Sequence, residues 1–324
     1  MSVTAADKPA VLTVVKLPPF YLEPLKANFT VHERLHETDP EAFVRIAPAI
    51  RALTGGGESV VSRALMDQLP ALEMISIMGV GYDKVDVAAA IERGIPVTHT
   101  PDVLNDEVAD LALGLMLSVA RRIPLADRYV REHKWETTGP MPLARKMSGA
   151  RLGIVGLGRI GSAIAKRAEA FGMSIAYTSR NPRPASPYRY HPSAKELAAN
   201  VDFLVAITPG GEGTRKMINA DVFKALGPRG FFINVARGTV CDEEALVEAL
   251  RSGTIAGAGL DVFEAEPKVP QALKDMDNVV LTPHMASATH ETRQAMADLA
   301  LDNLRAHFAG QPLLTPVPEC RAMR

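Results

Sequence analysis

The feature that most constrains the fold is the stretch from Arg151 to Gly161, whose glycines have the spacing G-x-G-x-x-G. The apolar run Leu152 to Val155 is typical of a buried strand, and the residues after the glycines repeat apolar positions at helical spacing. Strand, glycine turn and helix in this order are the context that a dinucleotide-binding fingerprint requires. The stretch therefore predicts a dinucleotide-binding α/β domain, the alternative being a tight strand–helix turn without a ligand.

The three glycines of this turn, Gly156, Gly158 and Gly161, have separate roles in such a fingerprint. The first permits the tight turn, the second lets the backbone approach a pyrophosphate, and the third lets the helix pack on the strand. The N-terminus of the helix then offers free N–H groups and a partial positive charge to the phosphate.

The end of the next predicted strand, Met173 to Thr178, indicates which dinucleotide is preferred. Enzymes that use NAD commonly carry Asp or Glu there, which accepts a hydrogen bond from the ribose 2′-OH. This chain has Ser179 and Arg180 instead, and no acidic residue lies between Ala170 and Lys195. A hydroxyl and a guanidinium bind a 2′-phosphate, which a carboxylate would repel. We expect NADP(H) to be preferred, with NAD(H) as the open alternative and a solvated basic loop as the interpretation without a ligand.

Composition excludes several other classes of protein. A chain of 324 residues is long enough for two domains, and its formal net charge of −1 gives no field that would favour nucleic acid or an anionic membrane. Cys241 and Cys320 lie far apart and have no disulfide or metal-binding spacing. The start of the chain lacks a secretory pattern, and the most apolar run, Leu111 to Ala120, is about half a membrane span. We expect a cytoplasmic enzyme with no metal site.

Short apolar runs alternate with helical patterns in both halves of the chain, which predicts parallel sheets with helices on their faces. In the first half, strands are predicted at residues 11–15, 50–53, 74–78 and 96–99, and helices at 42–46, 59–69 and 85–93. In the second half, strands are predicted at residues 152–155, 173–178, 198–206, 230–234, 255–260 and 278–281, with a helix at 242–250.

Two long helical patterns suggest how the domains are divided. One begins at Thr100-Pro101, runs to about Arg122 and becomes apolar nearly all round, so we expect it to be buried on several sides. The other, His290 to Phe308, is expected to return to the first domain. The predicted domains are a discontinuous substrate-binding domain, residues 1–99 and 286–324, and a dinucleotide-binding domain, residues 100–285.

Three residues that can perform chemistry follow predicted strands in the second half: Arg237 in N-V-A-R-G, Glu266 in D-V-F-E-A-E-P and His284 in T-P-H. In doubly wound sheets, ligands bind at the carboxyl ends of the strands. Taken alone, these residues could be a surface cation, a loop carboxylate and a capping residue. Together they suggest that the arginine binds a substrate carboxylate, the histidine exchanges a hydroxyl proton, and the glutamate holds the imidazole and favours its charged form.

The order of these motifs resembles the D-isomer-specific 2-hydroxyacid dehydrogenase family over nearly the whole chain. Met78 to Asp86 matches the substrate loop of that family, and Asn105 to Asp110 matches its interdomain helix. The resemblance implies an α/β fold of two Rossmann-like, doubly wound parallel-sheet domains with the active site in the cleft between them. It also implies a homodimer built on the interdomain helix near residues 100–122.

The resemblance further implies roles for individual residues. Arg237, Glu266 and His284 would be catalytic, and Asp261 would hold the nicotinamide carboxamide. The substrate-binding residues would be Leu53, Gly79, Val80 and Gly81 together with Arg237, with the N–H groups of Val80 and Gly81 on the substrate carboxylate. The other expected cofactor contacts are Val108, Gly156, Leu157, Gly158, Arg159, Ile160, Gly161, Ser179, Arg180, Thr208, Val235, Ala236, His284 and Ala286.

Within the family, the segments Ile50 to Thr54, Lys134-Trp135 and Thr178 to Arg180 are most similar to NADPH-dependent glyoxylate/hydroxypyruvate reductases. Formate dehydrogenases of this fold carry glutamine at the position of Glu266, which disfavours that activity. We expect hydride transfer from NADPH to a small 2-oxo acid, with His284 as proton donor. A reductase for phenylpyruvate-type substrates and a dinucleotide-sensing corepressor of the C-terminal binding protein type are the alternatives. Trp135 is either a core residue or one that reaches a neighbouring subunit's active site.

Overall fold

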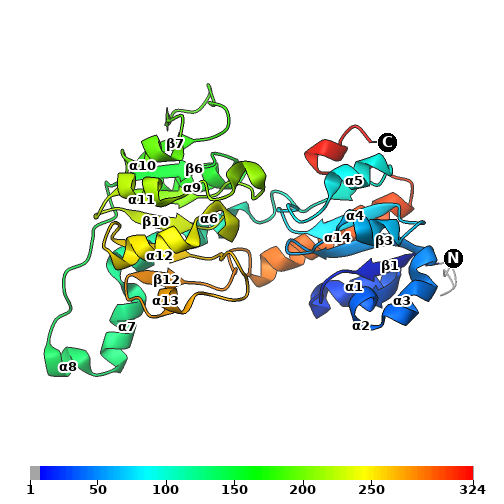
Figure 1. The fold of residues 1–324 in the computed structure, drawn as a ribbon, viewed down its shortest axis with the longest axis horizontal. Coiled ribbons are helices and arrows are strands. Elements are labelled where there is room, and N and C mark those ends of the chain that lie inside the picture. The colour runs from blue at the N-terminus through cyan, green and yellow to red at the C-terminus, as the bar shows by residue number, and fades with distance from the viewer. Residues whose placement is uncertain (1–7, 324) are drawn as a thin grey trace. The chain divides into compact units, whose positions relative to one another are not determined.

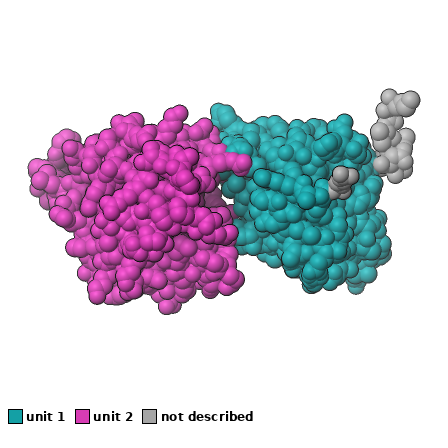
Figure 2. Space-filling view, turned by 90° about the horizontal axis from the view of Figure 1, so that it is seen from above, with its two compact units in different colours: residues 1–104, 288–324 teal, residues 105–287 magenta. Residues whose placement is uncertain are grey.

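The structure is a computed structural model that describes residues 8–323 of the chain (Figure 1). The chain forms two compact units, which Figure 2 shows in different colours. The first unit combines the N-terminal part of the chain up to residue 104 with the C-terminal part from residue 288. The second unit is continuous and comprises residues 105–287.

The first unit is built on a five-stranded parallel sheet with the strand order β2-β1-β3-β4-β5. The strands are β1 Ala10–Thr13, β2 Thr30–Glu33, β3 Ile50–Gly56, β4 Met74–Met78 and β5 Val97–Thr98. The helices are α1 Pro19–Asn28, α2 Leu35–Thr38, α3 Pro40–Ile46, α4 Arg63–Asp67, α5 Val87–Glu92 and α14 His290–Phe308. Every residue of β4 is buried, as expected of a parallel strand covered on both faces, and α14 packs against it. The hydroxyl of Ser76 on β4 donates to the carbonyl of Ala300 on α14 at 3.0 Å.

The second unit is built on a seven-stranded parallel sheet with the order β12-β11-β10-β9-β6-β7-β8. The strands are β6 Arg151–Val155, β7 Ser174–Thr178, β8 Arg189–Tyr190, β9 Phe203–Ala206, β10 Phe231–Asn234, β11 Gly257–Leu260 and β12 Val279–Leu281. The order of the strands reverses between β6 and β9, which is the topological switch point of a doubly wound sheet. The predicted fold class, α/β with two doubly wound parallel sheets, is confirmed.

Helices cover the second sheet and bury its apolar side chains. They are α6 Asn105–Arg121, α9 Arg159–Glu169, α10 Ala194–Ala198, α11 Ala220–Leu226, α12 Glu243–Arg251 and α13 Gln271–Lys274. Two further helices, α7 Ile123–Arg131 and α8 Lys134–Thr138, follow α6, contain no buried residue and extend away from the sheet (Figure 1). Helix α6 packs against β10, β11 and α9. Gly259 on β11 allows this approach, since a Cβ atom there would lie 2.9 Å from the Cβ of Leu115 on α6. None of the helices in the described part of the chain is long and apolar enough to cross a membrane.

Several predicted elements differ from those observed. The helix expected from Thr100-Pro101 begins at Asn105, because Asp102 has a left-handed φ of 72° that a right-handed helix does not accommodate. The strand expected at residues 198–206 begins only at Phe203. The residues before it form helix α10, whose N-terminus is capped by the hydroxyl of Ser193, which accepts from the N–H of Glu196 at 3.1 Å.

Candidate functional site

The site residues predicted in the second unit follow the carboxyl ends of its strands. Because all seven strands are parallel, these ends meet at one edge of the sheet. The residues at this edge are Gly156 after β6, Ser179 after β7, Thr208 after β9, Val235 after β10, Asp261 after β11 and His284 after β12. This is the edge at which doubly wound sheets bind their ligands.

The glycine turn between β6 and α9 has the geometry that each glycine requires. Gly156 has a φ of 105°, and a Cβ atom there would lie 2.7 Å from the carbonyl oxygen of Ile207. A Cβ atom on Gly161 would collide with the carbonyl oxygen of Gly156, so the third glycine lets α9 rest on the turn. A Cβ atom on Gly158 would meet nothing within 4 Å, and the N-terminus of α9 has no side-chain cap. An open space in front of uncapped helix N–H groups fits the pyrophosphate of a dinucleotide.

The loop after β7 offers a positive charge where a ribose 2′ substituent would lie. Arg180 is exposed and makes no ion pair with any residue that the structure describes. The hydroxyl of Ser179 donates to the carbonyl of Asn181 at 2.6 Å, so it must release this bond before it can donate to a phosphate. The loop is tied to its strand by the buried Tyr177, whose hydroxyl accepts from the N–H of Arg183 at 2.7 Å.

The loop that carries Arg237 is held by Asn234, the last residue of β10. The amide nitrogen of Asn234 donates to the carbonyl of Arg237 at 3.2 Å, and its oxygen accepts from the N–H of Ala236 at 3.1 Å. The guanidinium of Arg237 donates to the carbonyl of Ala236 at 2.8 Å. A Cβ atom on Gly238 would collide with the backbone of Phe263, so this glycine lets the loop lie directly against the one that carries Glu266.

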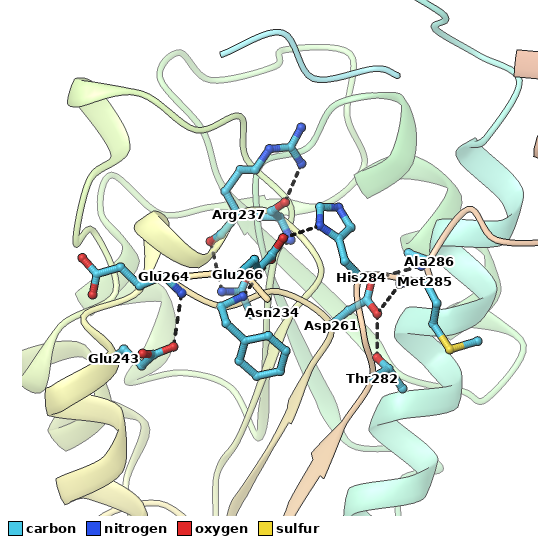
Figure 3. A network of polar contacts seen from close by, with 12 residues as sticks. Asn234, Arg237, Glu243, Asp261, Glu264, Glu266, Thr282, His284, Met285 and Ala286 are labelled. Atoms are coloured by element: carbon cyan, nitrogen blue, oxygen red, sulfur yellow. Dashed lines mark hydrogen bonds and ion pairs between the residues drawn. The ribbon is translucent and has the colours of Figure 1, made fainter. Parts of the chain in front are cut away.

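Glu266 and His284 form an ion pair next to Arg237, as Figure 3 shows. One carboxylate oxygen, Oε2, accepts from Nδ1 of His284 at 2.8 Å, and the other, Oε1, accepts from the N–H of Phe263 at 2.9 Å. Since a carboxylate only accepts, Nδ1 carries a hydrogen, and Nε2 is the ring atom that can exchange a proton with a ligand.

The environment of Glu266 keeps it ionised. Burial by itself raises the pKa of Glu266, but the hydrogen bonds from His284 and from the N–H of Phe263 outweigh it, aided by the charges of His284 and Arg237. The pKa of Glu266 therefore lies below its ordinary value, and the side chain is a carboxylate at neutral pH.

The turn that presents His284 is organised by Asp261, which is fully buried. One oxygen of Asp261 accepts from the hydroxyl of Thr282 at 2.6 Å and from the N–H of Met285 at 2.8 Å, and the other accepts from the N–H of Ala286 at 3.0 Å. These bonds hold His284 at a left-handed φ of 49°, a strained conformation for a residue with a side chain. Burial raises the pKa of Asp261, and these hydrogen bonds oppose the rise. A contact between Asp261 and a nicotinamide stays a prediction.

In the first unit, the predicted substrate residues lie on β3 and after β4. Leu53 is fully buried in β3. A Cβ atom on Gly79 would lie 2.9 Å from the Cα of Gly57, so two glycine-containing loops touch here. Within the described residues, the N–H groups of Val80 and Gly81 bond to no acceptor. Two adjacent free N–H groups fit a carboxylate of a small ligand.

The remaining predicted contacts differ in their exposure. Buried residues are Val108 on α6, Leu157, Val235 and Ala236; half-buried ones are Ile160, Thr208 and Ala286; Arg159 is exposed.

Trp135 on α8 is 60% exposed, so its interpretation as a core residue is wrong for this chain. Among residues 8–323 no group of His, Cys, Asp or Glu could hold a metal ion.

Sequence reasoning missed the residues that fix the loops. Asn234, Thr282 and Tyr177 hold the segments of Arg237, His284 and Arg180, and none of them touches the predicted reacting groups. Their positions at the end of a strand or directly after one are the signal that could have identified them.

Comparisons with known proteins identify a family and similar enzymes for this chain. Residues 113–286 match the model of the D-isomer-specific 2-hydroxyacid dehydrogenase NAD-binding domain. A glyoxylate/hydroxypyruvate reductase of Arabidopsis thaliana is 50% identical over 283 residues, 86% of this chain and 90% of that protein. A hydroxyphenylpyruvate reductase of Plectranthus scutellarioides is 52% identical over 271 residues, 84% of this chain and 86% of that protein.

A solved structure is also similar over nearly its whole length. It is the NADPH-dependent glyoxylate/hydroxypyruvate reductase of Sinorhizobium meliloti in complex with NADP and malonate. Its sequence is 47% identical, the TM-score is 0.93, and the alignment covers 98% of this chain and 99% of that chain.

Proposed function

The chain belongs to the D-isomer-specific 2-hydroxyacid dehydrogenase family, and from this premise we propose that it reduces glyoxylate and hydroxypyruvate to 2-hydroxy acids with NADPH. The observation that carries the proposal is the ion pair between Glu266 and His284 beside Arg237. A proton donor, a carboxylate that supports it and a guanidinium are the groups that reduction of a 2-oxo acid needs from a protein.

NADPH would be held at the carboxyl edge of the seven-stranded sheet. The backbone of Gly156 to Ile160 would bind its pyrophosphate, and Arg180 with Ser179 its 2′-phosphate. When bound, the cofactor supplies the hydride for the carbonyl carbon. The name of the Sinorhizobium meliloti relative, which states NADPH dependence, supports this assignment, as does the unpaired charge of Arg180.

The residues of the chain would bind the substrate and move a proton. Arg237 would bind the substrate carboxylate and hold its 2-oxo group, and the N–H groups of Val80 and Gly81 would donate to the same carboxylate. His284 would give the proton on Nε2 to the carbonyl oxygen. Glu266 would balance the positive charge of the imidazolium and fix the orientation of the ring through Nδ1.

We also propose that the protein is a cytoplasmic homodimer that pairs through α6 and the segment after it. Leu111 and Leu117 on α6 remain partly exposed, and beyond it Ile123 is 49%, Val130 55% and Leu143 100% exposed. Apolar side chains in such a contiguous segment favour a protein partner. The two free cysteines, both buried, fit a reducing compartment. A molar mass from light scattering tests the dimer.

A second candidate substrate class is the arylpyruvates. The relative from Plectranthus scutellarioides is named a hydroxyphenylpyruvate reductase, which favours arylpyruvates over the remaining 2-oxo acids as the second substrate class. The hypothesis of a dinucleotide-sensing corepressor lacks such support, and it predicts that the protein turns over no 2-oxo acid.

A turnover assay distinguishes these functions. The purified protein is given NADPH or NADH with glyoxylate, hydroxypyruvate, pyruvate or phenylpyruvate, and the oxidation of the nicotinamide is followed. We expect the highest kcat/KM with NADPH and either glyoxylate or hydroxypyruvate. A maximum with phenylpyruvate would support the second class, and no turnover with any 2-oxo acid would support a binding protein.

A further inference from the structure

His99 contacts the substrate loop without being part of it. This residue follows β5 and is 8% exposed, and its Nδ1 lies 3.0 Å from the carbonyl oxygen of Val80. A carbonyl oxygen only accepts, so Nδ1 carries the hydrogen and donates it.

The carbonyl of Val80 belongs to the same peptide unit as the N–H of Gly81. A trans peptide is planar, and its C=O and N–H point in opposite directions. A hydrogen bond that fixes the carbonyl therefore also fixes the direction of the N–H. The same bond polarises the peptide and makes its N–H a better donor.

A buried polar network holds His99 in place. The hydroxyl of Thr315 donates to the carbonyl of His99 at 2.6 Å, and it accepts from the amide of Asn303 on α14 at 2.8 Å. Asn303 is fully buried, and its amide oxygen also accepts from the N–H of Thr315 at 3.0 Å. The ring of Tyr82 stands edge-on to the imidazole with 5.2 Å between the centroids. Both the backbone and the ring of His99 are thus constrained.

We propose that His99 is a positioning residue for the substrate carboxylate, acting through the peptide between Val80 and Gly81. This inference rests on the proposed function, in which the N–H groups of Val80 and Gly81 bind that carboxylate. His99 needs no contact with the substrate, because it acts on the donor that makes the contact.

Three variants test the inference in the intact protein. His99→Leu removes the hydrogen-bond donor and puts an apolar side chain of similar bulk in its place. His99→Asn restores it, because the amide nitrogen of asparagine can lie where Nδ1 lies. His32→Leu is the matched control, since His32 is on β2, at the opposite edge of the sheet from β5. The measurements are KM for glyoxylate, the inhibition constant of oxamate as a carboxylate probe, KM for NADPH and Tm.

We expect His99→Leu to raise KM for glyoxylate and the inhibition constant of oxamate about fivefold, as for the loss of one hydrogen bond. KM for NADPH should stay unchanged, and His99→Asn and His32→Leu should behave like the wild type. Unchanged constants in His99→Leu, or equal losses in His99→Leu and His99→Asn, would overturn the inference.

Failure of the proposed function gives a different result. If the wild type turns over no 2-oxo acid, binding of oxamate to the protein with NADPH is measured by calorimetry. Fivefold weaker binding to His99→Leu than to the wild type would still support the role of His99. Absence of oxamate binding to the wild type would overturn both proposals.

Discussion

Replacing Glu266 with glutamine tests the proton-transfer pair most sharply, because the structure restricts how an amide can fit. Both carboxylate oxygens accept hydrogen bonds, one from Nδ1 of His284 at 2.8 Å and the other from the N–H of Phe263 at 2.9 Å. An amide has a single acceptor oxygen and an NH2 group. In Glu266→Gln, that NH2 group must therefore face either the N–H of Phe263 or the ring of His284.

The two orientations differ in their consequences. Facing the N–H of Phe263 would leave a donor without a partner, which costs about 1–3 kcal/mol. The amide should instead turn its NH2 group towards His284, which responds by moving its hydrogen from Nδ1 to Nε2. The ring then lacks the carboxylate that favours its charged form. We expect kcat for reduction to fall about 10²- to 10⁴-fold, the range over which a positioned general acid contributes.

Replacing Glu266 with glutamine should also change how stability and activity depend on pH. The pKa of Glu266 lies below its ordinary value, because burial, which raises it, is outweighed by the hydrogen bonds from His284 and Phe263 together with the charges of His284 and Arg237. Such a group stabilises the fold above its unfolded pKa and loses this contribution as the pH falls, so the stability difference between wild type and variant should shrink in acid. Because the variant lacks the carboxylate that contacts the proton donor, its profile of kcat/KM against pH should differ from that of the wild type.

The assay measures kcat and kcat/KM against pH in both directions for the wild type, Glu266→Gln and Glu264→Gln. Glu264 is the matched control, since it lies in the same loop but pairs with Arg215 at 3.6 Å. Glu264→Gln should resemble the wild type. Unchanged pH profiles and a kcat within a few-fold of the wild type in Glu266→Gln would show that Glu266 does not support proton transfer by His284.

Two further predictions concern the cofactor, and a third concerns the packing of α9. Ser179→Asp combined with Arg180→Ala should lower kcat/KM for NADPH about a hundredfold and favour NADH, since a charge-assisted bond is lost and repulsion is added; a wild type that prefers NADH would contradict the assignment. Gly158→Ala should keep the wild-type Tm, because its Cβ would meet nothing within 4 Å, but should raise KM for NADPH by filling the space in front of α9. Gly161→Ala should lower Tm instead, because its Cβ would collide with the carbonyl of the first glycine of the turn; equal Tm values for the two variants would show that the third glycine is not needed for packing.

Buried strands and long amphipathic helices could be predicted from the sequence, and polar or proline-containing elements could not. Met74–Met78 and His290–Phe308 have the predicted bounds because their apolar patterns are continuous. Helix α1 was missed because Pro19 and Pro24 indicate a loop, whereas burial of Tyr21 stabilises the helix. Strand β2 has few apolar residues and forms by pairing with β1.

From the sequence we could predict that Arg237, Glu266 and His284 each follow a strand. We could not predict which of these side chains contact one another. The contact between Glu266 and His284 depends on a strained turn that Asp261 holds from the end of β11. It also depends on Gly238, which lets two loops touch. Such contacts join residues that are distant in the chain, so no local pattern encodes them.

The proposed hydride transfer runs from the nicotinamide to the carbonyl carbon of a 2-oxo acid and gives the D-hydroxy acid. It is tested most directly by reducing hydroxypyruvate with NADPH that carries deuterium at both positions of nicotinamide C4. We expect glycerate of the D configuration with deuterium bound to C2, seen by mass spectrometry and chiral chromatography. Glycerate without deuterium, or glycerate of the L configuration, would contradict it.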